Sequence, residues 1–244
     1  MHSELKKVKP YDESRPKEEQ VEEMFDSIAP AYDFMNTAMT FGLHRRWRDK
    51  ALKRLRDAGG STLRVIDLAT GTGDVAFALS RLFPEAEITG VDLSEGMLEV
   101  ARKKQREGDR ILFESGDCLD LKYPDGSFDK LTIAYGVRNF EDLARGFREF
   151  HRVLTPGGTA MILELSRPEN PAIRLGYDIY SRGLIPLVGR MVSKDSRAYS
   201  YLPESIKAMP PRSRIAEMLR EAGFSDVSFK SMTMGVVTCY LATK

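Results

Sequence analysis

The sequence predicts an α/β fold built on a mostly parallel sheet, and three observations point to it. Between residues 64 and 165, short apolar runs alternate with stretches of helical periodicity, which is the pattern of a parallel sheet with crossover helices. A glycine turn at 71–73 joins the first apolar run to the first of these helices. Two further β-rich runs, at 227–232 and 236–243, predict a terminal hairpin joined to the same sheet.

Each element follows from a local pattern. Val65, Ile66 and Leu68 form the first apolar run, and helical character resumes after the glycine turn. The string TPGG at 155–158 predicts a sharp helix stop, and Gly223 closes a helix over 214–222. In chain order we predict strands at 64–69, 87–92, 110–114, 128–135 and 158–165, with helices at 74–82, 94–106 and 141–154.

The segments outside this alternation are predicted to be helices, a tail and a lid. Apolar residues at helical spacing predict a helix over 21–32, and a second helix covers 43–55. Residues 1–20 mix charges and prolines without periodicity, so we expect a mobile tail before a single domain at 21–244. The irregular insertion at 168–211 is expected to form a helical lid over a substrate pocket.

The insertion also carries a local excess of positive charge. Over residues 171–212, seven basic residues stand against three acidic ones. A surface that is both apolar and basic suits an anionic membrane. A transient contact with a membrane surface is therefore an expectation beside the simpler one of a lid that covers a pocket.

The composition is that of an ordinary globular protein, with 42% apolar and 30% charged residues. A formal charge of +1 argues against a nucleic-acid partner, because phosphate binding requires a clear basic excess. Cys118 and Cys239 lie far apart without metal-ligand spacing, so we expect no metal site and a reducing, cytoplasmic location. Neither a signal peptide nor a membrane span is expected, since no apolar run is long enough.

The glycine turn is the most informative segment. Gly71 and Gly73 let the backbone approach a ligand closely, and a strand, a turn and a helix in this order typically hold a nucleoside cofactor. The string GTGDVA at 71–76 also satisfies the G-x-G-x-x-A fingerprint of dinucleotide binding. Asp67, however, stands where a nicotinamide site would normally carry glycine or an apolar residue. The carboxylate favours a cationic ligand.

Acidic residues stand at or just after the ends of three successive predicted strands. Asp92 is placed to accept hydrogen bonds from two ribose hydroxyls, and Asp117 to accept one from an adenine amino group. A single Asp usually just caps a turn or helix, but three in series indicate a site for the sulfonium of S-adenosylmethionine. The predicted cofactor-binding residues are Asp67, Thr70, Gly71, Gly73, Asp92, Asp117 and Cys118.

Three further segments resemble a known family. They are YDFMN at 32–36 followed by His44 and Trp47, YGVRN at 135–139, and RVLTPGG at 152–158 followed by Glu164 and Ser166. Together they resemble the ubiquinone/menaquinone biosynthesis C-methyltransferase family from about residue 21 onward. The resemblance implies a class I, Rossmann-like methyltransferase fold whose seven-stranded sheet has an antiparallel C-terminal strand. Ala134 stands where some relatives carry a cofactor-contacting serine.

The resemblance also implies a reaction. It is methylation of a ring carbon on a prenylated quinol, demethylmenaquinol giving menaquinol, with the benzoquinol of the ubiquinone pathway as the other acceptor. By this resemblance we assign Arg138 to phenolate stabilisation, Asn139 to orienting the ring oxygen and Tyr32 to hydrogen bonding with the quinol. Without it, a surface salt bridge for Arg138 and a core position for Tyr32 would be preferred.

Two other classes of function remain open at this point. A nicotinamide-dependent oxidoreductase is compatible with the G-x-G-x-x-A match. A non-catalytic S-adenosylmethionine-binding subunit of a quinone-biosynthesis assembly is compatible with the same acids. A homodimer remains open as the oligomeric state.

Overall fold

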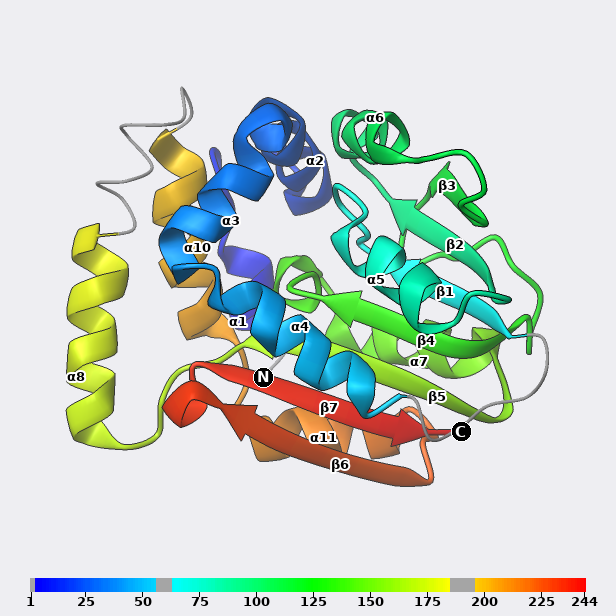
Figure 1. The fold of residues 1–244 in the computed structure, drawn as a ribbon. Coiled ribbons are helices and arrows are strands. Elements are labelled where there is room, and N and C mark those ends of the chain that lie inside the picture. The colour runs from blue at the N-terminus through cyan, green and yellow to red at the C-terminus, as the bar shows by residue number, and fades with distance from the viewer. Residues whose placement is uncertain (1–2, 56–62, 185–195) are drawn as a thin grey trace.

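The structure is a computed structural model that describes residues 3–55, 63–184 and 196–244. Within these residues, seven strands form one sheet in the order β3-β2-β1-β4-β5-β7-β6 (Figure 1). β1 to β5 pair in parallel, whereas β7 runs antiparallel to both β5 and β6. The predicted fold class is confirmed. The strands are β1 (Arg64–Leu68), β2 (Glu87–Asp92), β3 (Ile111–Ser115), β4 (Phe128–Ala134), β5 (Leu154–Leu165), β6 (Asp226–Met232) and β7 (Val237–Thr243).

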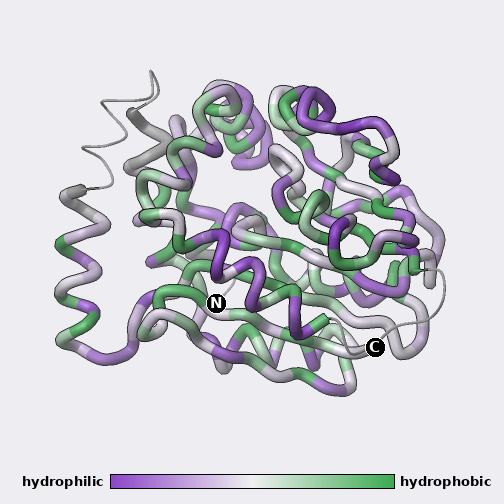
Figure 2. Tube along the Cα trace, viewed as in Figure 1, coloured by the Kyte–Doolittle hydropathy of each residue, from purple (hydrophilic) through white to green (hydrophobic). Residues whose placement is uncertain are grey.

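Helices cover both faces of the sheet because successive strand side chains point to opposite sides. Ile66 faces the layer that contains α7 (Leu143–Val153) and α11 (Arg212–Glu221). Val65 faces the layer of α4 (Leu43–Lys53), α5 (Asp74–Leu82) and α6 (Glu95–Lys104). In Figure 2 the hydrophobic stretches follow the central strands, and hydrophilic stretches mark outer turns such as those of α6.

Element boundaries differ from the prediction where side-chain caps and sheet pairing decide them. Ser94 and Asp142 accept hydrogen bonds from Met97 N and Arg145 N, so α6 and α7 begin one residue after these caps. The predicted stop at 155–158 lies inside β5. The pairing of β4 with β5 shifts register between Phe128 and Lys130, and this irregularity accommodates the extra residues.

The N-terminal part forms a layer above the carboxyl ends of the strands. It consists of α1 (Ser3–Lys7), α2 (Lys17–Ile28), η1 (Ala29–Ala31) and α3 (Tyr32–Thr40). The helix predicted over 21–32 is thus divided among α2, η1 and the first residue of α3, because Pro30 lacks the backbone N–H that would continue the hydrogen bonding of α2. Residues predicted as a mobile tail are packed here: Leu5, Lys17 and Gln20 are buried anchors that the charged composition conceals.

The insertion after β5 is helical over the residues that the structure describes. It contains α8 (Pro171–Ile179), the wider helical turn η3 (Tyr180–Leu184) and α10 (Ser196–Ala208). Residues 185–195 of the predicted lid lie outside the described part. Figure 1 shows α8 at the margin of the molecule, beside α10 and α3. Among the described helices, none has the length and apolar character needed to cross a bilayer.

Candidate functional site

Two adjoining cavities lie at the carboxyl ends of β1, β2 and β4. The small pocket, of about 90 Å³, is lined by Gly71, Asp92 and Asp117 together with side chains of α2. The large cavity, of about 540 Å³, lies between the N-terminal helices and the insertion. Phe25, Tyr32, Tyr135 and Asn139 line both spaces. A ligand in one can therefore meet a ligand in the other across these four residues.

The turn after β1 shapes the small pocket through Gly71 and Asp92. Gly71 has φ +55°, in the left-handed region that favours glycine, and its N–H donates to Asp92 Oδ2 at 2.7 Å. Asp92 Oδ1 accepts from Ser94 N at 2.9 Å. Burial raises the pKa of Asp92 to about 6, and these backbone N–H groups oppose the shift. The carboxylate keeps free lone pairs that can accept ribose hydroxyls.

Asp67 and Thr70 lie beneath the turn and line neither cavity. Asp67 is 1% exposed, and its two oxygens accept from Thr132 Oγ1 at 2.6 Å and Thr70 Oγ1 at 2.7 Å. Burial raises the pKa of Asp67 to about 7. The structure therefore makes this pair a support for the turn, whereas the sequence suggested that Asp67 faces a cationic ligand.

Gly73 is required for packing against neighbouring side chains. It has φ +82° and precedes α5, and a Cβ placed there would lie 2.8 Å from Phe77 Cε2 and 3.0 Å from Phe113 Cζ. Gly73 does not line the small pocket. The absence of a side chain at Gly73 lets the helix pack closely against the strand, a role that glycines commonly have in such turns.

Asp117 and Cys118 line the small pocket opposite α2. Asp117 Oδ1 accepts from Leu119 N at 2.8 Å, which fixes the turn after β3. Cys118 is buried, and burial raises the pKa of its thiol, so the side chain stays protonated at neutral pH.

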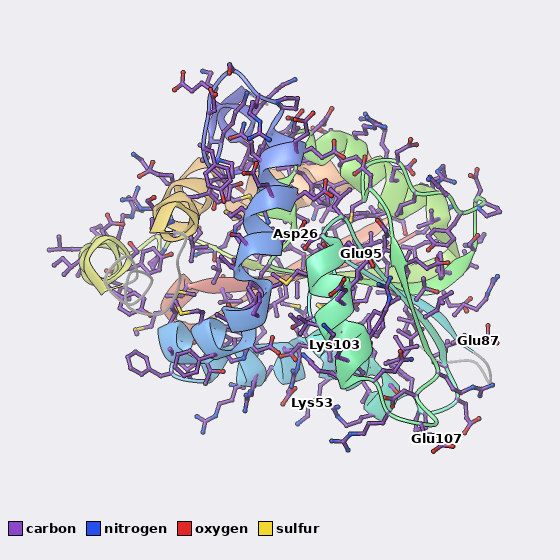
Figure 3. All side chains as sticks on the ribbon, turned by 90° about the horizontal axis from the view of Figure 1, so that it is seen from above. Asp26, Lys53, Glu87, Glu95, Lys103 and Glu107 are labelled. Carbon is purple, nitrogen blue, oxygen red and sulfur yellow. The ribbon has the colours of Figure 1, made fainter. Side chains whose placement is uncertain are left out.

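Two aspartates that the sequence reasoning did not single out hold the N-terminal helices over the pocket. Asp26 on α2 accepts from Ser94 Oγ at 2.6 Å and Gly96 N at 2.9 Å. Figure 3 shows Asp26 facing the start of α6, beside Glu95. Asp33 on α3 accepts from Thr72 Oγ1 at 2.5 Å and Lys104 Nζ at 2.9 Å. The sequence signal that could have identified Asp33 is its place beside Tyr32 in the YDFMN segment, because Asp33 anchors the helix that positions Tyr32.

Arg138 lies in the turn η2 (Val137–Asn139), at the wall of the large cavity. It is 6% exposed and pairs with Glu164 Oε1 at 2.9 Å, while Nη1 also donates to Tyr135 O. Within the described chain, its Nε and the Tyr135 hydroxyl are buried without a hydrogen-bond partner. A surface salt bridge, the alternative for Arg138, is therefore wrong.

Tyrosines dominate the boundary between the cavities. Tyr32 lines both, and burial raises its pKa, so its hydroxyl remains a donor. Asn139 Oδ1 accepts from Tyr201 Oη at 3.2 Å, which links η2 to α10 of the insertion. Tyr135 has φ +60°, a backbone conformation that is strained for a tyrosine and that marks functional positions. Sequence reasoning did not assign Tyr135 to the site, because nothing in the local sequence indicates that this residue has a positive φ.

The rest of the large cavity is mostly apolar, with Asn36, Thr40, His44 and Thr233 as its other polar lining residues. Its lining includes Met24, Ile28, Met35, Met39, Leu43, Trp47, Leu165, Ile173, Leu202, Ile206 and Val236. Such a space accepts a long hydrocarbon group far better than a charged one. A polar, acid-lined pocket thus meets an apolar cavity across tyrosine and asparagine side chains.

Solved structures share this fold at low sequence identity. The chain matches the [4+2]-cyclase SpnF with a TM-score of 0.68 and 19% identity, covering 93% of this chain and 96% of that one. A possible histamine N-methyltransferase from Thermotoga maritima matches with a TM-score of 0.62 and 19% identity, covering 91% and 99%. Fold and pocket together define a protein of the S-adenosylmethionine-dependent methyltransferase class.

Sequence comparison narrows the class. A model of the ubiE/COQ5 methyltransferase family matches residues 13–244, and the chain belongs to that family. It is 45% identical over 242 residues to a demethylmenaquinone methyltransferase of Bacteroides fragilis, covering 98% of both chains. A ubiquinone/menaquinone biosynthesis C-methyltransferase UbiE of Geobacter sulfurreducens is 40% identical, covering 93% of this chain and 90% of the relative. Because this chain belongs to a methyltransferase family, S-adenosylmethionine is the cofactor of this chain. The same membership excludes the alternative of a nicotinamide-dependent oxidoreductase.

Proposed function

We propose that this enzyme methylates a ring carbon of a prenylated quinol, converting demethylmenaquinol to menaquinol. The observation that carries the proposal is the shared wall, at which an acid-lined pocket opens on a large apolar cavity. The names of the relatives in Bacteroides fragilis and Porphyromonas gingivalis, both demethylmenaquinone methyltransferase, support the choice of acceptor.

The residues of the small pocket fit the cofactor. Asp92 is assigned to the ribose hydroxyls and Asp117 to the adenine amino group, with Cys118 beside it. Gly71 leaves the backbone open towards the pocket, and Asp67, Thr70 and Gly73 hold the turn in place. Bound S-adenosylmethionine supplies an electrophilic methyl group.

The residues of the shared wall fit the acceptor. A quinol carbon becomes nucleophilic when a neighbouring phenol loses its proton, so the site must stabilise a phenolate. Arg138 is assigned to that task because it lines the large cavity and its buried Nε has no hydrogen-bond partner among the described residues. Tyr32 and Asn139 are assigned to holding the ring oxygen, and the unpartnered Tyr135 hydroxyl joins them.

Labelled methyl transfer tests the acceptor. We expect label from S-adenosylmethionine to appear in short-chain demethylmenaquinol at a higher rate than in the demethylated benzoquinol. Transfer to neither quinol would contradict the proposal, and a preference for the benzoquinol would move the enzyme to the ubiquinone pathway.

We also propose that the rim of the large cavity touches a membrane surface. Phe41 and Met234 line the cavity yet are 77% and 70% exposed, and both have positive φ, at 51° and 53°. Leu175 and Ile179 expose a second apolar stripe on α8. Exposed apolar groups around a cavity mouth mark an interaction surface. The rim therefore lies at the α3–α4 and β6–β7 turns as well as in the insertion.

The charge beside this rim suits anionic lipid. Arg45 and Arg46 are exposed at the start of α4, next to Phe41, and no ion pair involves them within the described residues. Basic side chains near an apolar surface add roughly 1 kcal/mol each to binding at an anionic membrane.

Vesicle sedimentation tests this contact with matched variants. We expect Phe41→Ser with Met234→Ser to weaken binding to vesicles that contain phosphatidylglycerol, because both side chains lie exposed at the rim of the cavity. Leu112→Ser is the control, because Leu112 is equally apolar and 55% exposed on β3, at the opposite edge of the sheet. If the double variant binds vesicles normally but loses self-association in ultracentrifugation, the surface is that of a homodimer instead.

A further inference from the structure

Lys17, the first residue of α2, has a fully buried side chain. Its Nζ donates to three carbonyl oxygens, those of Leu5 at 2.8 Å, Arg138 at 3.4 Å and Phe140 at 3.4 Å. Burial lowers the pKa of Lys17 to about 8, and Glu141 opposes the shift. Lysine is almost never fully buried unless it is partnered, because removing an ammonium from water is costly.

The three carbonyl acceptors come from two separate parts of the chain. Leu5 belongs to α1, whereas Arg138 and Phe140 belong to the turn at the wall of the site. The backbone N–H of Lys17 adds a fourth contact, to Glu141 Oε1 at 2.9 Å. Leu5 also packs in one apolar cluster with Phe140. One side chain thus fastens the N-terminal segment to the turn that carries Arg138 and Asn139.

The fastened parts are walls of the small pocket. Glu18, Val21 and Glu22 line it from α2, immediately after Lys17. Asn139, Phe140 and Glu141 line it from the turn. The pocket therefore has its full wall only while the start of α2 lies against the turn.

Hydrogen bonds with Gln20 hold the chain before Lys17 against α2. Gln20, also fully buried, accepts from Tyr11 N at 2.9 Å and Asp12 N at 2.7 Å through Oε1, and donates through Nε2 to Asp12 O at 2.7 Å and Arg15 O at 3.0 Å. The loop after α1 is thereby wrapped onto the same helix face. Lys17 supplies the contact between this wrapped segment and the turn of the site.

We propose that Lys17 is a positioning residue of the methyl-transfer site: it clamps the N-terminal segment onto the Val137–Phe140 turn, which completes the cofactor pocket and sets the position of Arg138 and Asn139. The effect on transfer rests on the proposed function of that turn. The effect on the cofactor does not, because the cofactor pocket is formed without any acceptor.

The test compares Lys17→Met with Lys6→Met in the full chain. Met keeps the length of the stem and removes the donors, and Lys6 is a matched lysine whose side chain is 67% exposed and reaches the same Glu141 at 3.9 Å. We expect Lys17→Met to weaken S-adenosylhomocysteine binding in calorimetry by about tenfold, the factor that corresponds to losing a charged hydrogen bond. Lys6→Met is expected to bind as the wild type does.

A second variant and a kinetic split separate positioning from a general structural role. Leu5→Ser undocks α1 from Phe140 while leaving Lys17 in place, and we expect the same loss of affinity together with faster proteolysis before residue 17. In Lys17→Met, kcat should fall by a larger factor than the KM for the quinol rises, because Arg138 and Asn139 shift while most of the apolar lining of the large cavity comes from other elements. A variant with a lowered melting temperature but unchanged affinity and kcat, measured where it is folded, would overturn the proposal. If the affinity for S-adenosylhomocysteine falls as expected but neither the wild type nor any variant transfers methyl to a quinol, the positioning role of Lys17 in the cofactor pocket is supported and the proposed function is wrong.

Discussion

Arg138 and Glu164 form a buried ion pair at the wall of the large cavity, with Nη1 and Oε1 2.9 Å apart. Their side chains are 8% and 2% exposed. Glu164 Oε2 also accepts from Arg138 N at 3.2 Å, so the glutamate holds both the backbone and the guanidinium of the arginine. The pair presents a fixed positive group, with a free Nε, where the acceptor is expected to bind.

Replacing Arg138 should separate catalysis from cofactor binding. We expect Arg138→Ala to lower the rate of methyl transfer by about 100-fold or more, the usual effect of removing one donor to a developing oxyanion. Binding of S-adenosylhomocysteine should not change, because Arg138 does not line the small pocket. Unchanged transfer in this variant would contradict the assigned role.

The same replacement should destabilise the fold. Glu164 is left as a buried charge without its partner, which typically costs about 3–5 kcal/mol. Urea unfolding measures the loss. Arg214→Ala is the control, since its pairs with Glu217 and Glu221 lie on the surface and contribute little.

Asp92 should carry a large share of cofactor affinity. We expect Asp92→Ala to weaken S-adenosylmethionine binding by about 1–3 kcal/mol, because ribose hydroxyls and the Gly71 N–H lose their acceptor. Calorimetry measures the change, with Glu107→Ala, on the exposed turn before β3, as the control. Equal affinity of wild type and Asp92→Ala would show that the ribose lies elsewhere.

Asp67 should make stability fall as pH rises. Its pKa is about 7 in the folded protein and 3.8 ordinarily, so between these values the native state holds a proton that the unfolded chain has released. The contribution is therefore favourable at low pH and is lost as pH rises through that window. The side chain of Asp67→Asn does not titrate. As pH rises from about 4 to about 7, we therefore expect the free energy of unfolding of the wild type to fall by up to about 4 kcal/mol relative to that of Asp67→Asn. Urea unfolding at several pH values measures both curves, and parallel curves would contradict the prediction.

Trp47 offers a direct report on the large cavity. It is the single tryptophan, it lines the cavity, and its Nε1 donates to Thr233 Oγ1 at 2.8 Å. We expect a short-chain naphthoquinone to quench its fluorescence saturably, and S-adenosylhomocysteine alone to change it little. Quenching that grows linearly without saturation would indicate collision in solution and no bound quinone.

Local pattern was sufficient for most of the architecture. Alternation of apolar runs and helical periodicity identified the five parallel strands, the C-terminal hairpin and the class of cofactor, because these signals depend on neighbouring residues only. The predicted extents failed where long-range contacts decide them. Residues 3–20 are packed by Lys17 and Gln20, and β5 begins at Leu154 because β4 offers it a partner.

The candidate site divides in the same way. Residue types and their order along the chain were enough to select Asp92, Asp117 and the turn at Gly71, since acids after successive parallel strands must meet at one edge of the sheet. Which of these groups face a ligand depended on three-dimensional packing. Thr70 donates a hydrogen bond to Asp67 beneath the turn, and the absence of a side chain at Gly73 leaves room for Phe77 and Phe113. Among the described residues, the Tyr135 hydroxyl is buried without a hydrogen-bond partner. Chain order reveals which side chains share an edge, but hydrogen-bond partners and burial arise only when α2, α3 and the insertion close over that edge.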